Sequence, residues 1–167
     1  MSTNTVKKFQ DAVLKIADGG GTGGSNVITM ALSAGGLRYT TSTPKTVHKD
    51  RGSLSSGHAR NAEEEPMEWS IEAEFRGYES TAGTAAEITP YEALTQTGEA
   101  SGWVSDEPNS DVYGVILELT ITDPGDSTTE VVTIERAFTE TEDFAEAEEG
   151  DTLSFSGRAM VVRPTFS

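Results

Sequence analysis

The chain has 167 residues, which is the size of one domain with a single hydrophobic core. Its 28 acidic and 12 basic side chains give a formal net charge of −16, which disfavours tight binding of nucleic acid phosphates and is also typical of very soluble or salt-adapted (halophilic) proteins. It has no cysteine and no apolar run long enough to cross a bilayer, so we expect no disulfide and no membrane insertion. Lys7, Lys8, Asp11 and Lys15 interrupt any apolar run at the start, so we expect no secretory signal.

Three short stretches near the N-terminus have β-rich sequence and predict strands: Phe9 to Ile16, Asn26 to Ser33 and Gly36 to Thr41. Between the first two, Gly19 to Gly24 has the spacing G-x-G-x-x-G. The phosphate-binding use of that motif requires a helix to follow, whereas here a strand follows. We therefore interpret the glycines as a flexible turn.

A long segment, Thr40 to Pro66, shows little regular pattern and far exceeds ordinary connections of about 4 to 6 residues. It predicts a projecting arm that associates with an acidic partner surface, or a mobile loop with incidental charge. A Ser-His-Asp site is not supported, because the segment lacks a nucleophile elbow. Between Lys45 and Arg60, the charged and titratable residues of the arm are Lys45, His48, Lys49, Asp50, Arg51, His58 and Arg60.

The segment Met67 to Arg76 alternates apolar and polar residues and predicts a strand with one dry face and one wet face. Its wet face carries Glu68, Glu72 and Glu74. Glu72 and Glu74 would lie roughly 7 Å apart, as in some glycosidases. Such a site needs a buried carboxyl with a raised pKa, so the alternation favours a solvated face instead.

One helix is predicted at about residues 89–97. Thr89 is the N-cap, Pro90 occupies the first turn, Glu92 completes a capping box and Gly98 terminates the helix.

Two further alternating runs, Val112 to Thr122 and Thr129 to Ala137, flank a turn and predict a hairpin with Glu118 on its wet face. Leu153 to Val162 predicts another strand. Between these, Glu140 to Asp151 is acidic and lacks cations, which favours a solvated loop or a surface that receives a basic arm. These elements predict a mainly β, single-domain chain (1–167): an antiparallel sandwich or barrel with one short flanking helix and a long extended loop.

Three stretches resemble the major tail tube proteins of long, flexible, non-contractile (siphovirus-type) tailed viruses. They are Asp50 to Leu54 with Glu65 to Met67, the helix from Thr89 running on to Trp103, and Glu149 to Gly157 with the ending Pro164 to Ser167. The resemblance implies a tail-tube-like β-sandwich subunit, hexameric rings with inner strands joined into a barrel around a lumen, and an arm at about residues 40–66 that reaches the adjacent ring.

The resemblance also implies a structural virion protein rather than an enzyme, assembled in the host cytoplasm, with no cofactor. Its partners would be further copies of itself, tail terminator and baseplate or tip proteins, a tape measure protein inside the tube, and double-stranded DNA that passes without specific binding. We expect an acidic lumen wall, with Glu68, Glu72, Glu74 and Glu118 as candidates, and inter-ring contacts from Lys45, His48, Lys49, Arg51 and Arg60. The alternative is a β-sandwich binding module, either carbohydrate-binding or capsid-decorating.

Overall fold

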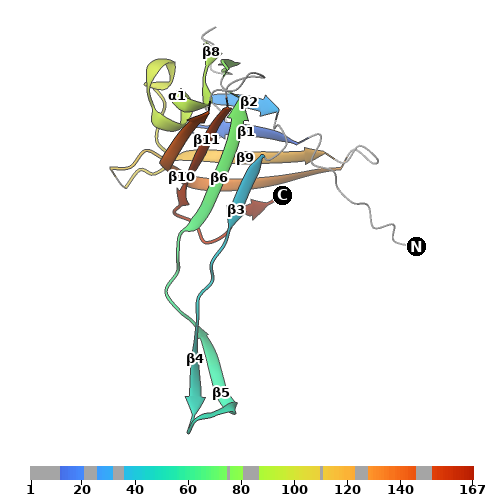
Figure 1. The fold of residues 1–167 in the computed structure, drawn as a ribbon, viewed down its shortest axis with the longest axis vertical. Coiled ribbons are helices and arrows are strands. Elements are labelled where there is room, and N and C mark those ends of the chain that lie inside the picture. The colour runs from blue at the N-terminus through green and yellow to red at the C-terminus, as the bar shows by residue number, and fades with distance from the viewer. Residues whose placement is uncertain are drawn as a thin grey trace, which may run out of the picture.

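A computed structural model describes residues 12–20, 26–31, 36–74, 76–80, 87–109, 111–122, 128–145 and 152–167. Most of its strands join one 8-stranded antiparallel sheet, in the order β2-β1-β9-β10-β11-β6-β3, with β12 paired to β10 (Figure 1). The strands of this sheet are β1 (Val13–Ala17), β2 (Val27–Ala31), β3 (Leu37–Thr40), β6 (Met67–Glu74), β9 (Val115–Thr122), β10 (Thr129–Ala145), β11 (Thr152–Ala159) and β12 (Thr165–Phe166). Within the described residues, no helix is long and apolar enough to cross a membrane.

The sheet forms two layers because β10 is long and bends. Its first half pairs with β9 and its second half with β11, and the register shifts between Ile134 and Ala137 and again between Thr139 and Thr141. In Figure 1, β1, β2 and β9 run across the view, whereas β11, β6 and β3 cross them steeply. We call β2, β1, β9 and the start of β10 the first layer, and the end of β10 with β11, β6 and β3 the second layer.

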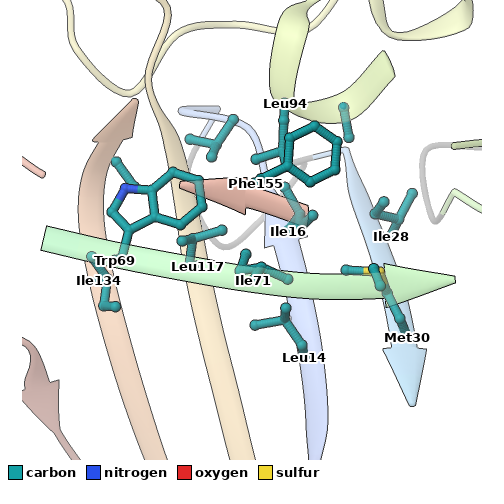
Figure 2. Close-up of a cluster of buried hydrophobic side chains, with 14 of the residues drawn as sticks. Leu14, Ile16, Ile28, Met30, Trp69, Ile71, Leu94, Leu117, Ile134 and Phe155 are labelled. Atoms are coloured by element: carbon teal, nitrogen blue, oxygen red, sulfur yellow. The ribbon is translucent and has the colours of Figure 1, made fainter. Parts of the chain in front are cut away.

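The core lies between these two layers (Figure 2). Leu14, Ile16 and Leu117 of the first layer face Trp69 and Phe155 of the second, and all five are buried. The predicted dry faces are therefore confirmed for Met67 to Ala73 and for Val115 to Ile121, while Phe75 lies outside the described residues.

The short helix α1 (Pro90–Thr95) confirms the predicted N-terminal signals, but not the predicted end. Thr89 accepts a hydrogen bond from the backbone of Glu92, and the Glu92 side chain bonds back to the Thr89 backbone. The helix ends at Gln96, which takes the left-handed conformation at φ 56°. Gly98 instead begins a 3-10 turn (Gly98–Ala100), where a Cβ would lie 2.0 Å from a Glu92 carboxylate oxygen.

The arm contradicts the prediction of an irregular loop, because it contains a β-hairpin. Strands β4 (Lys45–Asp50) and β5 (Ser53–Asn61) pair with each other and project from the body (Figure 1). Arg51 and Gly52 form the turn with φ of 47° and 82°, the signs required by a tight two-residue hairpin turn. The hairpin could not be predicted from the sequence, because almost all of its residues are exposed and no apolar alternation marks the strands.

The acidic segment that begins at Glu140 also differs from its prediction. Glu140 to Ala145 belong to β10 and pair with β11, and the remainder, 146–151, lies outside the described residues. A β9–β10 hairpin was correctly predicted, but β10 continues eight residues beyond its expected end at Ala137, to Ala145. Two short strands, β7 (Tyr78–Glu79) and β8 (Glu87–Ile88), form a small separate pair that the sequence did not predict.

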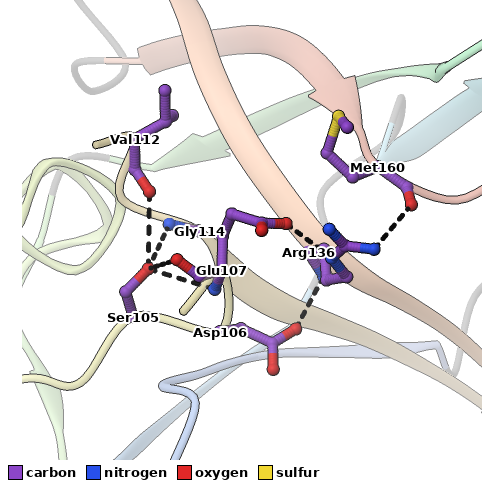
Figure 3. A network of polar contacts seen from close by, with 7 residues as sticks. All are labelled: Ser105, Asp106, Glu107, Val112, Gly114, Arg136 and Met160. Carbon is purple, nitrogen blue, oxygen red and sulfur yellow. Dashed lines mark hydrogen bonds and ion pairs between the residues drawn. The ribbon is translucent and has the colours of Figure 1, made fainter. Parts of the chain in front are cut away.

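A polar network holds the bend in β10 (Figure 3). Arg136 takes the left-handed conformation at φ 55°, which is costly for a residue with a side chain. Its backbone N–H donates to the Asp106 carboxylate at 2.6 Å, and its guanidinium donates to Glu107 and to the Met160 carbonyl. Glu107 is 3% exposed. Internal hydrogen bonds also hold the loop that carries Asp106 and Glu107, since the Ser105 hydroxyl accepts from the backbone N–H groups of Glu107 and Gly114.

This network generates a prediction about acid stability. The hydrogen bond from Arg136 lowers the pKa of Glu107, although burial acts in the opposite direction. A carboxyl whose pKa is lowered by folding stabilises the folded state above its ordinary pKa of about 4.3, and this contribution is lost as the pH falls through the lowered value. We expect Glu107→Gln to unfold a few degrees below the parent protein at pH 7, with the gap closing below about pH 4.

Thermal unfolding followed by circular dichroism between pH 7 and pH 3 measures the gap. Glu135→Gln, at the neighbouring exposed carboxylate, is the matched control and should unfold with the parent protein throughout. A gap for Glu107→Gln that persists unchanged to pH 3 would contradict the assigned ion pair.

Candidate functional site

The outward face of the second layer carries three of the four candidate lumen residues. Glu68, Glu72 and Glu74 are exposed and alternate along β6 with buried residues, so their side chains share one face, directed away from the core. Asp143 lies on the same face, because it pairs with Ser154, which in turn pairs with Glu72. One end of this face is therefore acidic.

The other end of the face is mixed in charge and hollowed. A hollow of about 330 Å³ is lined by Arg38, Glu68, Glu140 and Arg158, together with backbone and small polar groups of the same strands. The Arg158 guanidinium donates to Glu140 and lies over the Phe138 ring. The hydrogen bond and charge of Glu140, with a smaller contribution from Glu68, raise the pKa of Arg158. This face is thus not uniformly negative, because arginines partly neutralise Glu68 and Glu140.

Glu118 does not join the other three candidates. It lies on β9 in the first layer, on the outward face, and its carboxylate forms an ion pair with Lys15 of β1 at 2.7 Å. The outward faces of two packed layers point in opposite directions. A single wall formed by one face therefore cannot contain both Glu118 and the acidic residues of β6.

Among the described strands, the second layer has no further partner strand at either side. β3 pairs there with β6 alone, and the end of β10 pairs with β11 alone, because the described pairing with β9 stops at Ala137. Exposed strand edges present unpaired backbone N–H and C=O groups and readily pair with another chain.

The direction of individual backbone groups at the β10 edge follows from the ladder. The Glu72 N–H donates to Gly36 O at 3.3 Å, and successive residues of a strand direct these groups to opposite sides. Glu72 thus directs its backbone groups away from β11, so its pair on β11, Ser154, directs its own toward β10. Asp143, which pairs with Ser154, therefore faces β11, and its neighbour Glu142 directs its N–H away from β11. Glu142 therefore offers a backbone donor to the open edge.

The five basic candidates all lie on the arm hairpin, which the sequence did not predict. Lys45 donates to the Asn61 side chain across the strands, Arg51 occupies the turn, and Arg60 lies opposite Thr46. His48 stacks on His58, with ring centroids 5.3 Å apart. Two apolar side chains, Val47 and Leu54, are also exposed here, at 57% and 68%. The arm thus combines positive charge with uncovered apolar surface.

The geometry brings no catalytic constellation together on the arm. Asp50 pairs with Ser53 across the turn, while His48 contacts His58 instead of either of them. Across the described ranges, no three potential metal-ligating side chains gather at one point. Of the glycine-rich motif, Gly19 and Gly20 are described, and the next described element is strand β2 rather than a helix.

The sequence did not predict the roles of three buried or strained polar residues. Asp18 is 1% exposed and accepts hydrogen bonds from the backbone N–H groups of Gly20, Asn26 and Val104 and from the Asn26 amide, which ties the β1–β2 turn to a distant loop. Glu107 and Arg136 hold the bend described above. No local pattern marks them, because each acts on partners far away in the chain.

Comparison with known proteins supports the fold. No protein family model matches the chain, and no curated protein matches its sequence. Among solved structures, a chain from the sheath–tube complex of an extracellular contractile injection system (PVC), determined by cryo-EM in the extended state, superposes with a TM-score of 0.60. The match covers 99% of this chain and 93% of the other at 6% identity. The chain therefore has a tail-tube-like fold, and the neighbour comes from a contractile system rather than the expected non-contractile type.

Proposed function

We propose that this chain is the structural subunit of a tail tube, in which rings of identical subunits stack around a channel through which double-stranded DNA passes. The observation that carries the proposal is the second layer, which has no partner strand at either edge among the described strands. The likeness to a sheath–tube complex, which extends over nearly the whole chain, supports it. The projecting arm supports it as well, since its exposed apolar side chains, Val47 and Leu54, would be covered by a neighbouring subunit.

Ring formation follows from the two open edges. If β3 of one subunit pairs with the end of β10 in the next, the second layers join into one continuous sheet that closes on itself. Closure satisfies the edge backbone groups and removes the exposed edges. The outward face of the second layer, with Glu72 and Glu74, then becomes the channel wall.

A proline at the β10 edge tests ring closure. Glu142→Pro removes the N–H that points to the edge while keeping the bonds between β10 and β11, because proline is tolerated where no ladder bond is donated. We expect a folded subunit that does not form rings. Analytical ultracentrifugation and negative-stain electron microscopy measure ring formation, and circular dichroism checks the fold.

Glu142→Ala is the matched control, since it removes the same exposed side chain but keeps the N–H, and it should form rings. Normal rings from a folded Glu142→Pro variant would refute pairing through this edge. A parent protein that remains monomeric at high concentration would instead favour a solitary β-sandwich binding module.

Stacking of rings is assigned to the arm. Within the described residues β4 and β5 pair only with each other, and an isolated two-stranded hairpin is marginally stable in water. Its exposed Val47 and Leu54 and its basic side chains suit a second copy of this acidic chain, which would cover the apolar surface and neutralise the charge.

Removal of the arm tests this assignment. The backbone N–H of Ala62 donates to Pro44 O at 2.9 Å, so the base of the hairpin is already closed. Replacing residues 45–61 by a Gly-Gly turn should therefore leave the body folded and able to form rings, but the rings should not stack. Electron microscopy distinguishes single rings from tubes, and tubes of normal length would contradict the role of the arm.

The charge of the channel wall is assigned to Glu72, Glu74 and Asp143 at the acidic end of the face. An acidic wall repels DNA toward the axis, whereas several cations per ring, repeated over many rings, would bind phosphates and retain the polymer. In Glu72→Lys/Glu74→Lys tubes we expect assembly to persist while genome delivery falls by at least about tenfold.

The double substitution Glu130→Lys/Glu135→Lys, which makes the same charge change on β10 in the first layer, is the control. Plaque assays of particles complemented with each variant measure delivery. Equal infectivity of the two double variants would show that the outward face of β6 does not line the channel.

Hexameric rings, a long non-contractile tail, and partners such as a terminator, a tip complex and a tape measure protein belong to the same proposal. They rest on the resemblance described from the sequence. A place in the virion tail after assembly in the host cytoplasm is proposed on that basis too.

A further inference from the structure

The histidine pair on the arm is a feature that tube assembly by itself does not require. His48 and His58 lie directly opposite each other on β4 and β5, and their rings stack at 5.3 Å with an angle of 25° between planes. Histidine is the side chain whose charge ordinarily changes between about pH 5 and 8. Direct opposition therefore places two such charges in contact when both rings are protonated.

The rest of the hairpin carries mostly positive charge. Val47 and Ala59 form the next pair along and, because side chains alternate, lie on the opposite face. Thr46 and Arg60 form the pair after that, so Arg60 shares the face of the histidines. Lys45, Lys49 and Arg51 add further positive charge. Asp50 is the one acid between Lys45 and Asn61, and it lies at the turn.

Beyond the hairpin, the nearest acids are at its base. Glu63, Glu64 and Glu65 follow the end of β5, and Glu65 already accepts a hydrogen bond from Ser42 at 2.6 Å. Among the described strands, those packed against the histidines are β4 and β5 themselves. Protonation of both imidazoles therefore concentrates like charge on one face of the arm.

We propose that the His48–His58 pair makes the arm hairpin pH-sensitive: closed when at least one ring is neutral, and opened when both rings are protonated. Like charges directly opposite on paired strands destabilise the pairing. An isolated hairpin has little stability to lose, so even a small repulsion shifts its population. The consequence for stacking rests on the proposed function, because an opened arm no longer presents a formed surface to the adjacent ring.

The closed hairpin is more stable with the less charged pair, and this determines the direction in which its stability changes with pH. Hairpin stability is present at pH 7.5 and is lost as the pH falls through the range in which histidines gain protons. The double variant His48→Gln/His58→Gln stays neutral at every pH in this range and keeps polar side chains of similar size. Its hairpin should not respond to acid.

The test uses the full-length subunit at a concentration below that at which it assembles. Cross-strand NOEs between Val47 and Ala59, and between Thr46 and Arg60, report the closed hairpin by NMR at pH 7.5 and pH 5.0. We expect the ratio of closed to open arm to fall by about threefold in the parent protein. His48→Gln/His58→Gln should show no change, and the single variant His58→Gln should show a much smaller fall.

An unchanged ratio in the parent protein, or an equal fall in the double glutamine variant, would overturn the inference.

Tube growth is followed separately by sedimentation at the same two pH values. Growth that falls at pH 5.0 in the parent but not in the double variant supports the link to stacking, and equal growth at both pH values despite an opened arm refutes that link. An arm that opens in acid while no tubes form at any pH would instead count against the proposed function and leave the histidine pair's own behaviour established.

Discussion

The bend of β10 at Arg136 determines how the rest of the molecule is arranged. The first half of this strand is hydrogen-bonded to β9 and the second half to β11, so the bend converts one sheet into two facing layers. The core exists only because this conversion brings Leu117 and Ile134 opposite Trp69 and Phe155. Arg136 can hold a left-handed backbone there because Asp106 accepts from its N–H and Glu107 from its guanidinium.

The same bend leaves the second layer incomplete. Once β10 has turned away from β9, its end pairs on one side alone within the described part of the chain, and β3 forms the opposite edge of the layer in the same way. A solitary β-protein usually blunts or covers such edges. In the proposed tube, neighbouring copies of this chain pair with both edges.

The acidity of the chain is distributed unevenly, and this matters more than its total. Glu118 and Glu140 are matched by Lys15 and Arg158. Glu72 and Glu74 lie on the outward face of β6, where Glu74 makes a longer, exposed ion pair with Arg76 at 3.8 Å. The arm has the opposite charge. A body with an acidic face and a basic projection can associate with its own copies by charge complementarity while still repelling a polyanion from the proposed channel wall.

Local patterns in the sequence determined the strand faces and the start of the helix. Met67 to Ala73 alternate in step with the pleat, and Thr89 with Glu92 closes a capping box within one helical turn, so both can be deduced without knowing any distant contact. The arm's basic candidates and the exposure of Glu68, Glu72 and Glu74 followed from the same kind of local information.

Only the tertiary structure decided the rest. The extension of β10 through the acidic segment depends on pairing with β11, and the separation of Glu118 from the β6 carboxylates depends on which layer each strand joins. The hairpin within the arm has no dry face to mark it, and Asp18, Glu107 and Arg136 act on partners remote in sequence. Periodicity records which side of a strand is buried, but it does not record which strands become neighbours, and that choice is made by long-range backbone pairing and by the packing of the two layers.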